Sequence, residues 1–226
     1  MSIDPLSEKY AYQSHYNFSE NRVIDARELE GLEAYMVFNK STNTIMLTPD
    51  KSKWNANLPT KVVSATDYKS TDSKYNQIIK IENVFTGGRS EDGVVSRDPN
   101  RPMQKAIPNG TYDILDNDAD TKHEGWFRLD KQDSEPYNDK DDATGRDGFR
   151  FHLGSLSFGC VTCDNSKDDR KEEWQAVQTA LEGTTTTTVP EQRGNQGWNP
   201  FSWLTNYGTL KVTGQDKTPV KKEEKQ

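Results

Sequence analysis

Short runs of apolar residues, separated by turn residues, dominate the chain from Ala34 onward. The runs AYMVFN and TIMLT flank the polar turn KSTN, which predicts a β-hairpin. The runs KVVSATDY and QIIKIENVF follow, rich in Val and Ile, and the paired glycines of TGGRS mark a turn after the second run. This pattern predicts a fold in which strands dominate.

Further strands are expected downstream. The P-N-G of AIPNGTYDIL is typical of a turn that leads into a strand, and residues 126–129 form another short strand. RDGFRFHL is expected to be a central strand that ends near His152, after which the chain turns through GSLSFG to Cys160. GTLKVTG is the last predicted strand. Residues 115–124 and 131–144 are dense in Asp, Asn and Lys, which indicates solvated loops.

One helix is predicted, over residues 165–182. Ser166 and Asp169 have the spacing of a cap, and Gly183 stands where a helix should stop. Three apolar residues share one face of this helix, and we expect that face to pack against the sheet: Trp174, Val177 and Leu181.

Composition limits the classes of function. Apolar residues make up 31% of the 226 residues and charged residues 29%, so much of the chain must be loop or tail around a thin core. The net charge is -7 and no basic stripe is present, which argues against a nucleic-acid partner. No apolar stretch approaches the roughly 20 residues of a membrane-spanning helix, and MSIDPLSEKY lacks a signal-peptide core.

The segment FHLGSLSFGC carries the candidate chemistry. A catalytic thiol needs a base to take its proton and amide donors to hold an oxyanion. His152 precedes Cys160 by eight residues, and Gly154 and Gly159 permit a bend that brings the two side chains together. We expect the amides of Gly159 and Cys160 to face the developing charge, and Ser157 to orient the turn or donate to the substrate. The other two histidines, at positions 15 and 123, are interpreted as surface residues.

Cys160 and Cys163 form a CxxC, which in other proteins is a redox pair or half of a zinc site. A redox pair places its first cysteine at a helix N-terminus, whereas the predicted helix begins after Cys163. A zinc site of His152 with both cysteines would resemble the nucleobase deaminases, but their glutamate is Gly154 here. We therefore expect neither metal nor cofactor. Cys163 is a bystander, or a thiol that can form a strained, inactivating disulfide with Cys160.

The pattern H-x-x-x-x-S-x-G-C-V resembles the active-site signature of YkuD-type L,D-transpeptidases, and the order of predicted elements agrees with that fold. The match extends over six residues: Phe151, His152, Ser157, Gly159, Cys160 and Val161. The short spacing resembles the type VI secretion L,D-transpeptidase effector family in particular. Papain-like peptidases place cysteine before histidine, the reverse of the order here. The resemblance implies a mainly β, L,D-transpeptidase-like sandwich with one packed α-helix.

The chain also departs from the usual S-H-G-C signature, which is followed by a small apolar residue and Arg or Asn. Phe158 replaces the second histidine, and Thr162 follows Val161. Arg150 is the candidate for the missing positive charge toward a substrate carboxylate, and with Phe158 it forms the expected substrate-binding pair.

The first residues resemble the end of the core of Rhs-repeat toxins. The phrases DPL-EKY, YNFSENRVID and ELEGLE carry this likeness, which covers Asp4 to about Glu33 and implies that a toxin domain follows. We therefore expect an Rhs-derived arm over residues 1–33, a toxin domain over 34–215 and a disordered charged tail over 216–226.

The resemblance implies an antibacterial effector that acts on peptidoglycan stem tetrapeptides in the periplasm of a target cell. The expected catalytic residues are Cys160, His152, Gly159 and Ser157, and the expected reaction is L,D-carboxypeptidase cleavage or D-amino acid exchange. Rhs or secretion machinery would deliver the chain, and a cognate immunity protein is expected. The alternatives are a non-catalytic peptidoglycan-binding or delivery module with a degenerate transpeptidase fold, and a zinc hydrolase.

Overall fold

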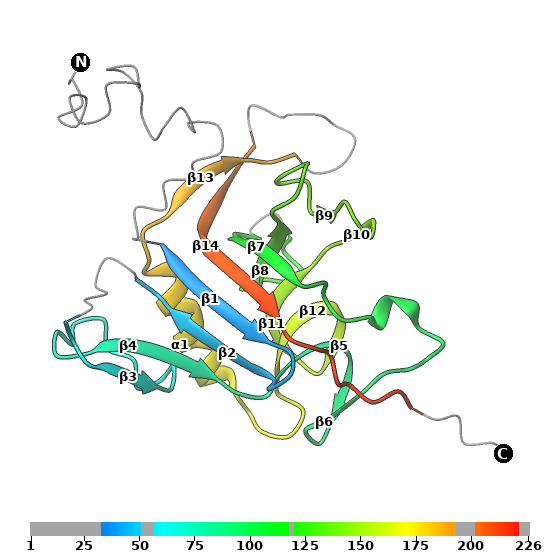
Figure 1. The fold of residues 1–226 in the computed structure, drawn as a ribbon, viewed down its shortest axis with the longest axis horizontal. Helices are drawn as coiled ribbons and strands as arrows, with labels where there is room; N and C mark the ends of the chain where they lie inside the picture. The colour runs from blue at the N-terminus through cyan, green and yellow to red at the C-terminus, as the bar shows by residue number, and fades with distance from the viewer. Residues whose placement is uncertain (1–32, 51–56, 118–119, 193–201, 222–226) are drawn as a thin grey trace. The chain divides into compact units, whose positions relative to one another are not determined.

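The computed structural model describes residues 33–50, 57–117, 120–192 and 202–221. All of these residues belong to the unit Gly31–Gln226. The Rhs-like arm therefore lies outside the described residues, apart from its last position. The described part is a large mixed sheet with one α-helix (Figure 1), so the prediction of a mainly β fold with one packed helix is confirmed.

Twelve of the described strands form one sheet, in the order β3-β4-β2-β1-β14-β7-β8-β11-β12-β5-β6, with β13 paired to β14. Their bounds are β1 Ala34–Asn39, β2 Thr44–Thr48, β3 Thr60–Val63, β4 Asn76–Ile81, β5 Val84–Glu91, β6 Val94–Ser96, β7 Gly110–Leu115, β8 Phe127–Lys131, β11 Arg150–Gly154, β12 Leu156–Asp164, β13 Thr187–Pro190 and β14 Trp203–Thr213. The strands β9 Lys140–Asp141 and β10 Arg146–Asp147 pair separately, and Pro102–Gln104 form a 3-10 turn, η3. The pairs β1 with β14, β3 with β4 and β11 with β12 are parallel.

The predicted first hairpin is confirmed as the antiparallel pair β1 and β2. Its apolar side chains alternate, and Met36, Phe38, Ile45 and Leu47 are fully buried. Because side chains of a strand point to opposite faces in turn, this alternation puts one face of the hairpin into the core. In the strand order of the sheet, β14, β7 and β8 separate this hairpin from β11 and β12, the strands of His152 and Cys160.

The helix α1 spans Lys171–Glu182 and begins six residues later than predicted. The hydroxyl of Ser166 does not cap it. Instead, this hydroxyl accepts a hydrogen bond from the Gly93 amide at 2.9 Å and lies 2.9 Å from the Ser90 hydroxyl, which ties the preceding loop to β5 and the turn after it. Gly183 ends the helix as predicted, and its predicted apolar face is buried: Trp174, Val177 and Leu181.

One predicted strand is two strands, and two predicted turns lie largely within strands. The run QIIKIENVF splits into β4 and β5 at Asn83, whose φ is 51°, because β4 pairs with β2 whereas β5 pairs with β12. The paired glycines lie inside β5, with φ of 66° for Gly87 and 116° for Gly88. The segment GSLSFG is not simply a turn either, since Leu156 and Ser157 already pair with β5.

The second predicted loop, residues 131–144, is more ordered than its composition indicates. It contains β9, and the side chains of Asp139 and Asp141 are buried. Residues 216–221, which belong to the predicted tail, also make contacts: Arg97 pairs with Asp216, and the Lys221 amide donates to the Arg97 carbonyl at 2.7 Å.

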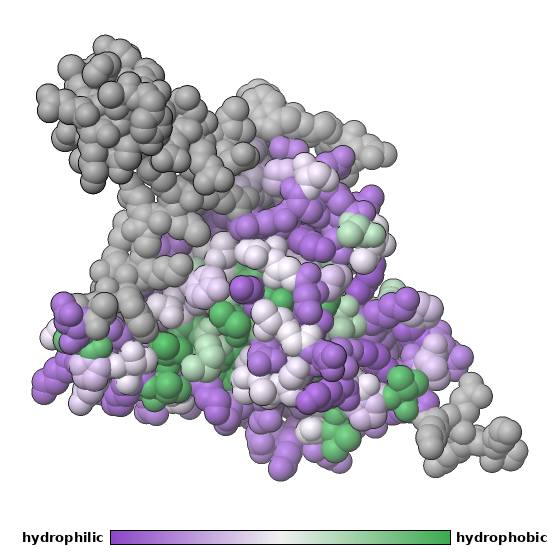
Figure 2. Space-filling model, viewed as in Figure 1, coloured by the Kyte–Doolittle hydropathy of each residue, from purple (hydrophilic) through white to green (hydrophobic). Residues whose placement is uncertain are grey.

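Hydrophilic residues cover most of the face drawn in Figure 2, with smaller apolar areas between them, in keeping with the charged composition. No helix in the described part of the chain is long and apolar enough to cross a membrane.

Candidate active site

Strand register brings the predicted site residues together on one face of the sheet. Phe151 is paired with Val161, and His152 with Thr162, in the parallel pair β11 and β12. Because side chains alternate, His152 and Thr162 share one face, while Phe151 turns to the other face and packs on Trp174 of α1, with ring centroids 4.9 Å apart. The candidate site therefore lies on the face of β11 and β12 opposite the helix.

Cys160 stands on an irregular part of β12. The register with β5 runs through Ser157 opposite Gly88 and resumes at Val161 opposite Thr86, so residues 158–160 form an excursion opposite a single residue of β5. An excursion of this kind re-aims side chains next to a paired strand. It projects Cys160 into the pocket that His152 also lines.

Two buried hydroxyl groups hold the excursion in place. Ser157 donates a hydrogen bond to the Cys160 carbonyl at 2.8 Å and accepts one from the Gly87 amide at 2.9 Å. Thr86 donates to the Gly159 carbonyl at 3.2 Å. The carbonyl groups of Gly159 and Cys160 therefore point into the protein. Ser157 is fully buried, and these are its contacts within the protein.

Gly159 is required by its conformation and by its neighbours. Its φ is 97°, a region that favours glycine, and a Cβ at this position would lie 2.1 Å from Nη2 of Arg146. The Arg146 guanidinium donates to the carbonyls of Ala106 and Lys105 at 2.7 and 2.8 Å. The glycine at position 159 predicts a close approach of the substrate, whereas the group that lies close to it is the Arg146 guanidinium.

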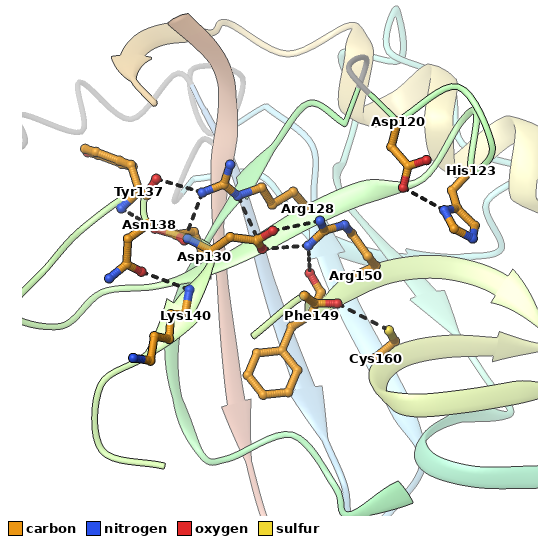
Figure 3. A network of polar contacts seen from close by, with 12 residues as sticks. Asp120, His123, Arg128, Asp130, Tyr137, Asn138, Lys140, Phe149, Arg150 and Cys160 are labelled. Atoms are coloured by element: carbon orange, nitrogen blue, oxygen red, sulfur yellow. Dashed lines mark hydrogen bonds and ion pairs between the residues drawn. The ribbon is translucent and has the colours of Figure 1, made fainter. Parts of the chain in front are cut away.

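The Cys160 thiol is buried, with 8% of the residue exposed. Burial raises its pKa, because a thiolate is poorly solvated there, and backbone N–H groups of Arg150 and Phe158 together with the Arg150 charge oppose this rise. The sulfur contacts the Gly148 carbonyl at 3.9 Å (Figure 3). The thiol therefore needs a base before it can act as a nucleophile.

His152 is 2% exposed and held on three sides. Its Nε2 lies 3.1 Å from the Thr162 hydroxyl and its Nδ1 lies 3.0 Å from the Leu153 carbonyl. The Trp126 indole stacks on the ring, with centroids 3.8 Å apart and an interplanar angle of 9°. Burial lowers the pKa of His152 to about 4, so the imidazole is neutral and able to accept a proton at neutral pH. No hydrogen bond joins His152 to Cys160 within the described ranges.

Arg150 lies beside Cys160 with its charge already balanced. Its guanidinium donates to both carboxylate oxygens of Asp139, at 2.6 and 2.8 Å, and to the Phe149 carbonyl at 2.9 Å (Figure 3). This bidentate geometry holds the guanidinium firmly. The guanidinium of Arg150 therefore binds a carboxylate of the protein in the place where a substrate carboxylate was predicted.

A second, fully buried arginine, Arg128, contacts the same carboxylate, Asp139, that binds Arg150. Arg128 forms ion pairs with Asp130 at 3.3 Å, with Asp139 at 3.4 Å and with Glu191 at 3.2 Å, and it donates to the Tyr137 carbonyl at 2.7 Å. The Asp130 carboxylate accepts the amides of Tyr137 and Asp139, two residues with positive φ. This network fixes the loop that presents Asp139 to Arg150.

The pocket has a volume of about 500 Å³, and its wall contains both polar and apolar groups. It is lined by Asp120, His123, Trp126, Gly148, Arg150, His152, Leu153, Gly154, Ser155, Leu156, Phe158 and Cys160. Phe158, the residue that replaces a histidine of the usual signature, is 43% exposed at its rim.

Sequence reasoning missed the group formed by Asp120, His123 and Trp126. Successive turns join them, because the His123 amide donates to the Asp120 carbonyl at 3.0 Å and the Trp126 amide to the His123 carbonyl at 3.2 Å. The three-residue spacing D-x-x-H-x-x-W is the only local signal. Their place in the pocket depends on contacts with β11, which that spacing does not encode.

Cys163 lies apart from the site, buried in the core cluster with Phe151 and Val161. The His152, Cys160 and Cys163 side chains therefore do not face one another as zinc ligands would. In the part of the chain that the structure describes, no three His, Cys, Asp or Glu side chains converge as a metal-binding group.

The fold and the pocket define a mainly β domain whose buried cysteine and neutral histidine face a common pocket. Residues 92–192 match the Tlde1 domain, that of the type VI secretion L,D-transpeptidase effector family, and this span includes every residue that lines the pocket. The match extends over 101 of the 226 residues and is a likeness to L,D-transpeptidase-like effectors whose substrate is peptidoglycan. No curated protein matches the chain. The matched span does not reach the Rhs-like residues, so that resemblance stays a prediction.

Proposed function

We propose that this chain is a cysteine acyl-transfer enzyme that removes or exchanges the terminal D-alanine of peptidoglycan stem tetrapeptides. One observation carries the proposal: Cys160 and His152 line one pocket inside the span that matches the Tlde1 domain. The neutral state of His152 and the buried thiol supply a base and a nucleophile precursor in the same cavity.

The first half-reaction begins with transfer of the thiol proton to the imidazole. Since the ring nitrogens of His152 contact Thr162 and Leu153 and not the sulfur, the proposed transfer requires the ring to turn toward Cys160 when substrate enters. The Cys160 thiolate then attacks the carbonyl carbon of the third stem residue, and amides near Gly159 hold the oxyanion. The C–N bond breaks, the proton passes from His152 to the departing D-alanine amine, and a thioester remains.

In the second half-reaction a nucleophile cleaves the thioester. Water adds to the carbonyl carbon, the C–S bond breaks and a proton returns to the thiolate, which gives a tripeptide. A free D-amino acid in place of water gives exchange. Either outcome removes donor peptides for cross-linking, as an effector acting in a rival's periplasm requires, and a cognate immunity protein would protect the producer.

The remaining predicted residues have supporting roles in this proposal. Ser157 and Gly159 shape the excursion that presents Cys160. Arg150 acts on the sulfur through its charge and its amide, and we assign it to thiolate stabilisation before substrate binding. Phe158 offers an apolar contact to the peptide at the pocket rim.

Mass spectrometry of purified tetrapeptide fragments tests the proposal. The fragments are incubated under reducing conditions with the unchanged chain, with Cys160→Ala and with Cys163→Ala, each with and without a free D-amino acid. Loss or exchange of D-alanine is expected with the unchanged chain and with Cys163→Ala, and should vanish with Cys160→Ala. Unchanged fragments in all samples would refute the proposed acyl-transfer activity.

A non-catalytic binding module is the second candidate. The contact of His152 with Thr162, in place of a hydrogen bond to Cys160, favours it. Such a module would bind the fragments equally well with Cys160→Ala and leave them intact, so the same incubation followed by calorimetry separates the two functions.

A further inference from the structure

The hydroxyl of Thr86 joins two segments of the chain behind the excursion of residues 158–160. Thr86 lies on β5 and is 3% exposed. Its Oγ1 accepts a hydrogen bond from the Ile107 amide at 2.8 Å and lies 3.2 Å from the Gly159 carbonyl oxygen. The amide supplies its own proton and the carbonyl can only accept, so the single proton of the hydroxyl is directed at Gly159. The hydroxyl therefore fixes the direction of the Gly159 carbonyl group.

The direction of this carbonyl group sets the direction of the Cys160 amide. The two groups belong to one peptide unit, which is planar and trans, so its C=O and N–H bonds point in opposite directions. The carbonyl is directed at Thr86 on β5, which leaves the Cys160 N–H directed away from that strand. Cys160 lines the pocket and Thr86 does not. The amide next to the nucleophile is thus held by a side chain outside the pocket.

The two groups that hold the Thr86 hydroxyl are themselves anchored away from the pocket. The Thr86 carbonyl accepts a hydrogen bond from Nη2 of Arg97 at 2.8 Å, and that guanidinium pairs with Asp216. Ile107 is fully buried, and its carbonyl accepts Nζ of Lys40 at 3.1 Å. The position of the hydroxyl is therefore set by contacts other than the one it makes with the excursion.

We infer that Thr86 is a positioning residue for the oxyanion of the acyl transfer. The inference rests on the proposed function, because an oxyanion forms when the Cys160 sulfur attacks a carbonyl carbon. As the C–S bond forms, an electron pair of the C=O bond moves to the oxygen, and the Cys160 amide donates to that oxygen. The register of β12 with β5 is interrupted at the excursion, so the Thr86 hydroxyl, and not a regular strand ladder, aims this amide.

Two reactions of the Cys160 sulfur separate this role from a general disturbance of the site. p-Nitrophenyl acetate acylates the sulfur: the C–S bond forms, negative charge develops on the carbonyl oxygen, and p-nitrophenolate leaves as the C–O bond breaks. Iodoacetamide alkylates the sulfur: the C–S bond forms as iodide leaves, and no oxyanion develops. Both reactions need the thiolate, whereas acylation alone needs the oxyanion donor.

Both rates are measured in the Cys163→Ala background, together with kcat/KM for release of D-alanine from the stem tetrapeptide. Thr86→Val removes the hydroxyl at nearly constant shape, and Thr86→Ser keeps the hydroxyl. Thr209→Val is the matched control, since Thr209 is a threonine of β14 that is 5% exposed and does not line the pocket. Circular dichroism confirms that each variant is folded under the conditions of the assay.

Thr86→Val should slow acylation and D-alanine release by about tenfold. This loss is smaller than the roughly hundredfold cost of removing an oxyanion donor, because the amide is misdirected and not deleted. Alkylation should keep its rate. Thr86→Ser should restore most of the acylation rate, and Thr209→Val should behave as the unchanged chain.

An equal fall in acylation and alkylation would overturn the inference, because Thr86 would then act on the thiol itself. An acylation rate unaffected by Thr86→Val would overturn it as well. If the unchanged chain is acylated by the ester but releases no D-alanine, the proposed activity on stem peptides fails, and the ratio of acylation to alkylation still decides the role of Thr86. A chain that neither the ester nor the tetrapeptide acylates would refute both.

Discussion

Nε2 of His152 lies 3.1 Å from the hydroxyl of Thr162 on the neighbouring parallel strand. In the proposed reaction the ring leaves this contact when it turns toward the sulfur, so the Thr162 hydroxyl positions the imidazole in the resting site, before substrate enters. Arg or Asn occupies this position in the usual signature, so the hydroxyl is a feature of this chain.

Thr162→Val should therefore lower kcat/KM by about fivefold to tenfold, because the imidazole loses the hydrogen bond that positions it before it turns toward the sulfur. Binding of the substrate should change little, since Thr162 does not line the pocket. Thr162→Ser keeps the hydroxyl and should restore most of the rate. Steady-state kinetics of D-alanine release measures both, and equal rates for the valine and serine variants would contradict the orienting role.

The pH profile should reflect the buried state of His152. Its pKa is lowered to about 4, below the value of about 6.5 for an exposed histidine, so the neutral, proton-accepting form persists as the pH falls. We expect kcat/KM to stay level from pH 7 to about 5 and to decline only as the pH nears about 4. Circular dichroism at each pH serves as the folding control. An acid limb near pH 6.5 would show that the imidazole is solvated in the active state.

The two cysteines should differ in their reaction with iodoacetamide. Cys160 lines the pocket, whereas Cys163 is in the core, where burial raises its pKa to about 12. Native labelling should modify Cys160 first and Cys163 only after denaturation, as peptide mass mapping would show. Faster labelling of Cys163 would mean that β12 opens more readily than its pairing with β5 and β11 indicates.

Arg128→Met should destabilise the domain by about 3 to 5 kcal/mol, because it removes the cation around which buried carboxylates gather. Arg101→Met is the control: Arg101 pairs with Asp98 at the surface and should contribute less than about 1 kcal/mol. Urea denaturation followed by tryptophan fluorescence measures both. Similar midpoints for the two variants would contradict the structural role of the buried network.

Much of the local structure could be predicted from the sequence. The hairpin of β1 and β2 has strict alternation around a polar turn, and the end of α1 at Gly183 follows from a glycine after an apolar stripe. The start of α1 could not be predicted in the same way, since Ser166 bonds Gly93 far away in the sequence. A local capping pattern fails to predict the helix start when the hydroxyl of the capping residue bonds a group far away in the sequence instead.

The sequence by itself determined which residues carry the candidate chemistry, because a histidine, a serine, a glycine and a cysteine at these spacings constitute a recognisable pattern within one short segment. Only the tertiary structure decided what surrounds them. The excursion of residues 158–160 depends on β5, the charge of Arg150 is taken up by Asp139, and Asp120 with His123 enters the pocket through Trp126. The physical reason is that each of these contacts joins segments that come together only when the strands pair, and a local window of sequence does not contain the energies of long-range pairing.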